Sequence, residues 1–244
     1  MISRLSAISV FFPAYNEEAN LKRTVKKALE ILPKIANTWE ILVINDGSED
    51  NTGEIAENLK RENPNIRVIH HRQNRGYGAA LKSGFYNAKY KWIAFCDADG
   101  QFDFSEITRF IDTQQKTNAD LVIGYYLKRK VPFLRILGSK LLWEPVVFLL
   151  FGLKVRDIDC GFKLIKKEII EKIPQLEAER GPFISSELLI KAKRQGYKIA
   201  EVGVHHYPRK AGKATGASLK VILSGFSDLW RLRGKLQTKF EADG

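Results

Sequence analysis

Cysteine and methionine are scarce in this 244-residue sequence, which has two of the first and one of the second. Two cysteines, Cys96 and Cys160, cannot form a disulfide framework for a chain of this length, so we expect a reducing compartment. Long apolar runs are also missing, and no run reaches the roughly 20 residues that a membrane-spanning helix needs. The first residues lead directly into a strand-like stretch without a signal-peptide pattern, so no secretory leader is expected.

Acidic residues are outnumbered: 28 Asp and Glu against 40 Lys and Arg give a net charge of +12 and a sequence pI near 9.6. Such an excess predicts a polyanionic partner, and composition alone leaves nucleic acid, a diphosphate-bearing substrate and an anionic membrane surface open. The hydrophobic share of 44% and the charged share of 28% are typical of a globular domain and exclude wholesale disorder.

In the first half of the chain, short apolar runs alternate with stretches of helical periodicity. This alternation predicts an α/β fold with a mostly parallel sheet covered on both faces, which binds ligands at the carboxyl ends of its strands. The expected strands are Ala7–Phe12, Glu40–Ile44, Ile66–His70, Trp92–Cys96 and Leu121–Gly124, and the expected helices are Glu17–Ile31, Asn51–Glu62, Tyr77–Ala88 and Ser105–Gln115.

The second half contains two apolar segments flanked by basic residues, Val131–Leu153 and Ala217–Leu236. Either segment can be a helix of the core or a helix lying in a membrane interface. No internal repeat or long linker divides the chain. We therefore predict one domain over residues 1–212, followed by a basic amphipathic segment over residues 213–244.

Two carboxylates, Asp97 and Asp99, follow the apolar run Trp92–Cys96, and Gln101 lies two residues after Asp99. Alternate residues leaving a strand project into one site, and hard oxygen ligands of this kind suit Mg²⁺ or Mn²⁺. A solvated turn is the competing interpretation. The position after a core strand favours a metal site.

Polar residues also follow two other expected strands. Pro13, Tyr15 and Glu17 come after the first strand, and Asp46 comes after the second. Tyr15 can offer a flat face to a nucleobase, while Glu17 and Asp46 can accept hydrogen bonds from a base or ribose. Each residue alone fits ordinary turn or helix-start chemistry. Acidic clusters at three strand ends together favour a binding site.

Several motifs in this order resemble family 2 glycosyltransferases. The general motifs are VFFPAYNEE (Val10–Glu18), VINDGS (Val43–Ser48), NRGYGAA (Asn74–Ala80) and DADGQ (Asp97–Gln101). The segments Val155–Phe162, Glu187–Leu189 and Val202–Arg209, with Gly212, resemble the dolichyl- and polyprenyl-phosphate branch of that family. The resemblance covers about residues 6–212. It implies the GT-A fold, a three-layer αβα architecture, together with a sugar-nucleotide donor and a lipid-phosphate acceptor.

The same resemblance implies roles for individual residues. The catalytic residues would be Asp97, Asp99 and Asp157, and the metal, Mg²⁺ or Mn²⁺, would be held by Asp99 and Gln101. The donor, GDP-mannose or UDP-glucose, would be bound by Pro13, Tyr15, Glu17, Asp46, Asp97 and Arg209. The phosphate of the polyprenyl or dolichyl acceptor would be held by Arg135 and Ser139.

The chain departs from the family pattern at two places. Asn45 stands where an aspartate is usual, although its neighbour Asp46 is kept. Tyr125 and Tyr126 stand where many members have Ser-Arg, which removes one expected contact to the acceptor phosphate; Lys128 or Arg129 could replace it.

The remaining conspicuous groups favour structural roles. The pairs His70-His71 and His205-His206 have no metal-ligand spacing. Gly76 and Gly78 lack a full phosphate-loop fingerprint, so tight packing between a strand and a helix is expected there.

The expected function is metal-dependent, inverting transfer of a hexose to a polyprenyl phosphate at the cytoplasmic face of a membrane, to which the protein attaches peripherally. Transfer to a saccharide or a protein is the alternative enzyme, with Asp157 or Asp159 as the base. A nucleic-acid-binding protein is the alternative class. We expect no nucleic acid as partner, because no recognised motif is present and the basic residues lie beside apolar segments.

Overall fold

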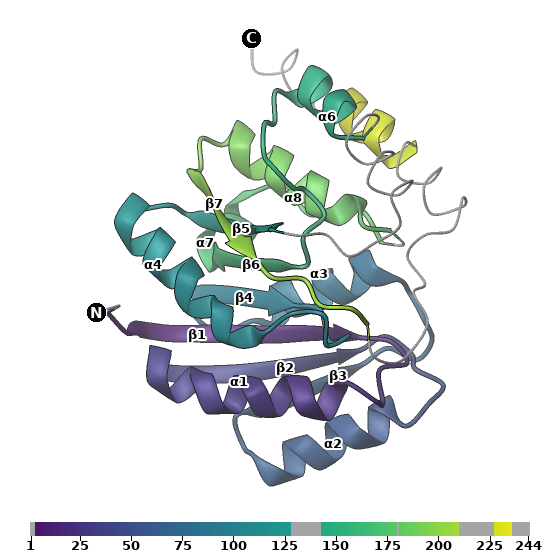
Figure 1. The fold of residues 1–244 in the computed structure, drawn as a ribbon. Helices are drawn as coiled ribbons and strands as arrows, with labels where there is room; N and C mark the ends of the chain where they lie inside the picture. Colours follow the sequence, from purple (N-terminus) through teal and green to yellow (C-terminus); the bar gives the residue numbers. More distant parts are fainter. Residues whose placement is uncertain (1–2, 128–142, 180, 210–226, 236–244) are drawn as a thin grey trace.

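A seven-stranded sheet forms the centre of the computed structural model, which describes residues 3–127, 143–179, 181–209 and 227–235 (Figure 1). The strand order is β3-β2-β1-β4-β6-β5-β7. The strands are β1 (Leu5–Ala14), β2 (Ala36–Asn45), β3 (Ile66–His70), β4 (Trp92–Cys96), β5 (Leu121–Tyr126), β6 (Phe162–Lys166) and β7 (Ile199–Val204).

Every strand pairing is parallel except the two made by β6, which runs antiparallel to both β4 and β5. The predicted mostly parallel sheet is therefore confirmed, and all five strands expected in the first half are present. The strand β6 was not predicted. It joins the parallel group β3-β2-β1-β4 to the pair β5-β7.

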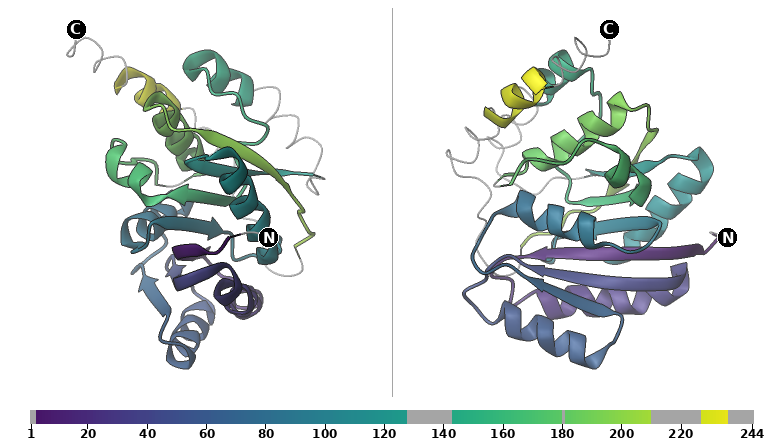
Figure 2. Two further views of the ribbon diagram at one scale, coloured as in Figure 1. Left: turned by 90° about the vertical axis from the view of Figure 1, so that its left-hand side faces the viewer. Right: turned by 180° about the vertical axis from the view of Figure 1, so that it is seen from behind.

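Successive strand residues point to opposite faces of the sheet, so the core has two parts. In β1, Val10 and Phe12 belong to one hydrophobic cluster, while Phe11 between them belongs to the other. The first cluster is covered by α1 (Leu21–Ile35), α2 (Thr52–Glu62) and α4 (Ile107–Thr117). The second is covered by α3 (Tyr77–Asn87), α6 (Glu144–Phe151), α7 (Lys167–Lys172) and α8 (Phe183–Arg194). The three-layer αβα architecture is thus as predicted, and Figure 2 shows the sheet between its two helix layers.

Two predicted helices begin later than expected. Residues 17–20 form a turn in which the carbonyl oxygen of Glu17 accepts from the amides of Asn20 and Leu21, so α1 begins at Leu21. A short 3₁₀ turn, η1 (Phe104–Glu106), precedes α4. Both delays leave a polar loop between a strand end and its helix, which is where the site residues lie.

The described part of the C-terminal segment, residues 227–235, is helical. Its Leu229 and Leu232 are buried in the second cluster, and Lys235 forms an ion pair with Glu177 at 2.6 Å. This helix therefore packs on the domain by one face, while Trp230 is exposed. The rest of the segment 213–244, including most of Ala217–Leu236, lies outside the described residues.

Candidate functional site

The carboxyl ends of β1 and β4 meet the chain that leaves β7, and Arg209 joins them. Its guanidinium contacts Glu17 Oε1 and Asp99 Oδ2, both at 3.0 Å. Glu17 comes from the loop after β1, Asp99 from the loop after β4, and Arg209 from the segment after β7. Three residues singled out from distant motifs thus lie in direct contact.

The segment after β7 reaches this place because it is bound along the loop after β4. The amide of Tyr207 donates to the carbonyl oxygen of Gln101 at 2.8 Å, and Gln101 Nε2 donates to the carbonyl oxygen of Tyr207 at 3.0 Å. His205 contacts Glu106 through its backbone amide and its ring at 2.9 and 2.8 Å. The neighbouring ring of His206 packs on Tyr126. These contacts bring Arg209 to Asp99.

Negative charge accumulates at this end of the sheet. Burial, reinforced by the charge of Asp99, raises the pKa of Asp97 to about 7. Burial also raises the pKa of Glu17, while its contacts with Asn20 and Arg209 oppose that shift. Among the described residues, Arg209 therefore does not fully offset the cost of burying these carboxylates.

A divalent cation would supply further positive charge beside these carboxylates. Asp97 and Asp99 offer hard oxygen atoms whose mutual repulsion a cation would relieve. Among the described residues, no cluster of three or more His, Cys, Asp or Glu side chains could enclose a metal by itself. Mg²⁺ is typically held by one or two carboxylates together with substrate phosphates, so the pair fits such an ion.

Gln101, the other predicted metal ligand, has a structural task in this arrangement. Its amide nitrogen holds Tyr207, and its backbone amide donates to Asp99 Oδ1 at 3.0 Å. Gln101 therefore links Asp99 to the segment that bears Arg209. Its metal contact stays a prediction.

Asp157 is buried, and its Oδ1 accepts from the amide of Asp159 at 3.1 Å. The same loop reaches Asp97, because the carbonyl oxygen of Gly161 accepts from the amide of Asp97 at 3.2 Å. A Cβ on Gly161 would lie 2.1 Å from Asp97 Oδ2, so only glycine fits there. The structure thus places the loop of Asp157 against Asp97.

Asp46 holds a loop of the protein together. Its buried carboxylate accepts from four donors: His71 Nδ1 at 2.5 Å, Asn74 Nδ2 at 3.1 Å, and the amides of Arg75 and Gly76 at 2.9 and 2.8 Å. A carboxylate offers about four acceptor positions, and these contacts use all of them. Asp46 thereby anchors the loop between β3 and α3. Its contact with a nucleoside stays a prediction.

The other predicted nucleoside contacts lie near the end of β1. Pro13 is still within the strand and is buried, whereas Tyr15 follows the strand and is half-buried. Glu17 is anchored from behind, since its amide donates to Thr52 Oγ1 at 2.8 Å. The two residues expected to hold the acceptor phosphate, Arg135 and Ser139, lie outside the described residues.

The sequence reasoning missed two residues of this site. Tyr77 donates its hydroxyl to Asp97 Oδ1 at 2.9 Å. Lys163, fully buried in β6, donates to the carbonyl oxygens of Ile158 and Cys160 at 3.2 and 2.5 Å and thereby holds the loop of Asp157. The available signal was their place at the motifs: Tyr77 stands between Gly76 and Gly78 in NRGYGAA, and Lys163 directly follows the motif Val155–Phe162.

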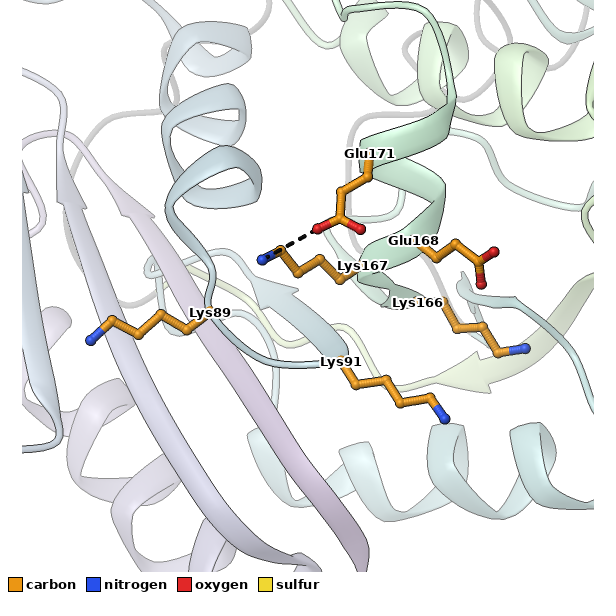
Figure 3. Close-up of a pocket in the computed structure, with 6 residues that line it drawn as sticks. All are labelled: Lys89, Lys91, Lys166, Lys167, Glu168 and Glu171. Atoms are coloured by element: carbon orange, nitrogen blue, oxygen red, sulfur yellow. Dashed lines mark ion pairs between the residues drawn. The ribbon is translucent and has the colours of Figure 1, made fainter.

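A second cluster of charged side chains lies at the opposite end of the sheet. It surrounds a cleft of about 330 Å³, lined by Lys89, Lys91, Lys166, Lys167, Glu168 and Glu171 (Figure 3). Lys167 pairs with Glu171 at 3.4 Å, and Lys166 pairs with Asp120 at 2.5 Å. Carboxylates thus balance part of the positive charge, and none of the sequence motifs reaches this cleft.

A family model described as "Glycosyl transferase family 2" matches residues 9–174. The dolichyl-phosphate beta-glucosyltransferase ALG5A of Trichomonas vaginalis is 32% identical over 210 residues, which are 81% of this chain and 64% of that protein. The polyprenol monophosphomannose synthase of Mycolicibacterium smegmatis is 30% identical over 239 residues, 93% of this chain and 88% of that protein. The chain thus spans less than two thirds of the first relative and most of the second.

Among solved structures, glucosyl-3-phosphoglycerate synthase from Mycobacterium tuberculosis, in complex with Mn²⁺, UDP-glucose and phosphoglyceric acid, superposes with a TM-score of 0.70 at 20% identity. The match covers 94% of this chain and 80% of that one. At this identity the likeness shows the fold alone. It confirms the predicted GT-A architecture.

Proposed function

Because the chain belongs to glycosyltransferase family 2 and is an enzyme of that family, we propose that it transfers a glucosyl or mannosyl unit from UDP-glucose or GDP-mannose to a polyprenyl or dolichyl phosphate. Both relatives named above have polyprenol-type phosphate acceptors in their names, which supports the acceptor class. The donor sugar differs between them, so the choice of hexose is left to experiment.

The observation that supports this function best is the contact of Arg209 with both Glu17 and Asp99. Donor transfer needs a place where a nucleotide diphosphate meets positive charge beside groups that hold a sugar and a nucleoside. Here a guanidinium, two strand-end acids and a further, half-buried carboxylate, Asp97, lie together at the carboxyl edge of the parallel strands, where ligands of such sheets bind.

We propose the following division of labour for the donor. Pro13, Tyr15 and Glu17 hold the nucleoside, Asp97 lies near the ribose and diphosphate, and Arg209 turns from Asp99 towards the diphosphate. A Mg²⁺ or Mn²⁺ ion at Asp99, next to Asp97, would neutralise the leaving diphosphate. Asp46 fixes the loop that leads into α3, and we keep its predicted contact with the nucleoside as part of the proposal.

The acceptor simplifies the chemistry. The second pKa of a phosphate monoester lies near 6, so a polyprenyl phosphate is largely dianionic at neutral pH and needs no strong base to become a nucleophile. The chain must position two anions and stabilise the leaving group. We propose in-line displacement with inversion at the anomeric carbon, with Asp157 near the reacting centre and Arg135 and Ser139 on the acceptor phosphate.

Membrane attachment is part of the same proposal, because a polyprenyl chain resides in a bilayer. No helix among the described residues has the length and apolar content of a membrane span. Instead, Phe148 and Leu149 of α6 and Trp230 of helix 227–235 are exposed, and both helices lie at the same end of the molecule (Figures 1 and 2). Arg231 and Arg233 follow Trp230 in the same helix. We propose peripheral attachment to a cytoplasmic membrane face through this end.

A transfer assay tests the function. The purified chain is incubated with polyprenyl phosphate and either radiolabelled UDP-glucose or GDP-mannose, with Mg²⁺, with Mn²⁺ and with a chelator. We expect a labelled lipid with one donor, loss of product on chelation, and recovery when the metal is returned. No product with either donor, or label on an added saccharide or protein instead of the lipid, contradicts the proposal.

The acceptor site needs its own variant. Arg135→Ala should raise KM for polyprenyl phosphate about ten- to hundredfold and leave donor binding unchanged, since a charge-assisted hydrogen bond to phosphate is worth about 1.5–3 kcal/mol. An equal loss of donor affinity would place Arg135 at the nucleotide or in the fold.

A further inference from the structure

The carboxylate of Asp97 is held from two sides by the protein itself. On one side, the hydroxyl of Tyr77 donates to Asp97 Oδ1 at 2.9 Å. On the other, the backbone of Gly161 lies so close to Oδ2 that no side chain fits at position 161. The backbone amide of Asp97 is also bound, to the carbonyl oxygen of Gly161. The hydrogen bond from Tyr77 and the nearby backbone of Gly161 therefore restrict the orientations open to this side chain.

Tyr77 can hold the Asp97 side chain because its own backbone is held by hydrogen bonds on both sides. It is the first residue of α3, and the two amides before it, those of Arg75 and Gly76, are bound to the buried Asp46. The amide of Ala79, just after it, donates to the carbonyl oxygen of Glu179 at 2.9 Å. The start of α3 is thus fastened to the loop after β2 on one side and to the segment before α8 on the other.

The contact between Gly78 and residue 178 fastens it further. A Cβ on Gly78 would meet the carbonyl oxygen of Ala178 at 2.6 Å, so helix and loop approach as closely as glycine allows. The segment of Ala178 is in turn held by Glu187 of α8, whose carboxylate accepts from the amides of Glu177 and Ala178 at 2.9 Å. Motion of the Tyr77 ring is restricted by these contacts.

We propose that Tyr77 is a positioning residue, whose hydroxyl fixes the orientation in which Asp97 meets the donor. Burial, reinforced by the charge of Asp97, raises the pKa of the Tyr77 phenol well above its ordinary value, so the phenol keeps its proton at neutral pH and donates a hydrogen bond to Asp97. Asp97 Oδ1 is thereby bound, which favours the observed orientation of its carboxylate over others. The role rests on the proposed function, because it concerns the residue assigned to the sugar nucleotide.

The test is Tyr77→Phe, which removes one hydroxyl and keeps the ring. We expect kcat/KM for the sugar nucleotide to fall about ten- to hundredfold, the range typical for groups that orient a ligand-binding side chain. Binding of the matching nucleoside diphosphate with Mn²⁺, measured by calorimetry, should weaken in the same direction. KM for polyprenyl phosphate and the melting temperature should stay close to those of the parent.

Tyr86→Phe is the matched control. Tyr86 lies on the same helix, and its hydroxyl accepts from the amide of Leu176 at 3.0 Å, away from the site. This variant loses one hydroxyl contact as well, but it should keep the donor parameters of the parent.

Three outcomes would overturn the role of Tyr77: unchanged donor kcat/KM and nucleotide binding in Tyr77→Phe, an equal loss in both tyrosine variants, or a parallel loss for donor, acceptor and melting temperature. Failure of the proposed function is recognised separately, since the parent would then transfer no hexose to polyprenyl phosphate. Nucleotide binding would still measure the role of Tyr77.

Discussion

The loop after β2 and the loop after β4 flank the end of β1, and each begins with an aspartate beside a glycine-containing turn. Their aspartates have opposite surroundings. Asp46 is surrounded by four hydrogen-bond donors, all from the segment 71–76. Asp97 and Asp99 accept fewer hydrogen bonds from the described residues than they have acceptor positions, and the charge of Asp99 contributes to the raised pKa of Asp97.

The difference teaches which strand-end acid is structural and which can bind a ligand. A carboxylate with all acceptor positions filled contributes to folding, because removing it leaves buried donors unpaired. A pair of carboxylates short of positive charge stores repulsion that a cation can relieve. Both loops contain small and acidic residues, so composition does not distinguish their aspartates, whereas the number of donors around each oxygen does.

The largest effect is expected at the charge-deficient loop. Asp99→Ala should lower turnover about a thousandfold, because metal-assisted stabilisation of the leaving diphosphate is worth several kcal/mol and each 1.36 kcal/mol is a factor of ten in rate. The melting temperature should change little, since the half-buried Asp99 contributes few packing contacts. Transfer assays measure the turnover, and electron paramagnetic resonance measures the binding of Mn²⁺.

Asp103→Ala provides the control within the same loop. The Asp103 side chain accepts from the amide of Ser105 at the start of η1, so its loss should cost about 1 kcal/mol of stability and leave turnover intact. Parent-like turnover in Asp99→Ala would exclude the metal assignment.

The fold of the first half could be predicted because its signals are local. Buried strands such as Trp92–Cys96 are apolar runs of the right length, and the helices between them show helical periodicity. The strand β6 gave no such signal, since Lys163 and Lys166 interrupt it. Lys163 is nevertheless fully buried, because its ammonium donates hydrogen bonds to the carbonyl oxygens of Ile158 and Cys160 and lies 5.3 Å from the centroid of the Phe95 ring.

The site was predictable as a set of strand ends but not in its internal contacts. Topology brings Glu17 and Asp99 together, since β1 and β4 are neighbours in the sheet. The saturation of Asp46 by His71 and the amides of residues 75 and 76 depends on loop geometry, which periodicity does not encode. The hydrogen bond from Tyr77 to Asp97 likewise depends on where α3 begins.

The second prediction addresses the saturated loop. Asp46→Ala should lower the free energy of unfolding by about 3–5 kcal/mol, because His71 and two backbone amides lose their buried partner. Urea unfolding measures this loss. Asp112→Ala on α4, where the carboxylate pairs with Lys116 at an exposed position, should change stability by less than about 1 kcal/mol. If the Asp46→Ala protein is stable and binds the nucleotide more weakly, the result supports a direct contact between Asp46 and the nucleoside.

The third prediction uses Arg209, which bridges the loops after β1 and β4. Arg209→Gln should raise KM for the sugar nucleotide about ten- to hundredfold, since a charge-assisted contact to the diphosphate is lost. Mn²⁺ binding without nucleotide should become tighter, because Asp99 Oδ2 is released from the guanidinium. The variant should therefore lose affinity for the sugar nucleotide and gain affinity for Mn²⁺.

Arg231→Gln is the control for this pair of measurements, because Arg231 pairs with Asp228 at 3.6 Å in helix 227–235, away from the acids of the site. It should alter neither measurement. Weaker Mn²⁺ binding in Arg209→Gln would mean that the guanidinium supports the metal rather than competing with it.

The smallest effect is expected at the end of the molecule where α6 and helix 227–235 lie. Trp230 is 60% exposed, while Leu229 and Leu232 of the same helix are buried, so its ring is available to a membrane without any change in packing. The Arg233 guanidinium lies 5.6 Å from the ring centroid and adds positive charge beside it. Each basic residue near an anionic leaflet contributes about 1 kcal/mol, and burial of an aromatic side chain about 1.5–3 kcal/mol. Partial insertion of one ring therefore predicts a loss of roughly three- to tenfold in vesicle partitioning for Trp230→Ala.

Flotation with anionic vesicles at low and high salt measures this partitioning. The parent should float at low salt and detach as salt rises, and Trp230→Phe should behave like the parent. If the parent remains in solution with anionic vesicles at low salt, or if Trp230→Ala floats as well as the parent, this end of the molecule does not bind the membrane through Trp230.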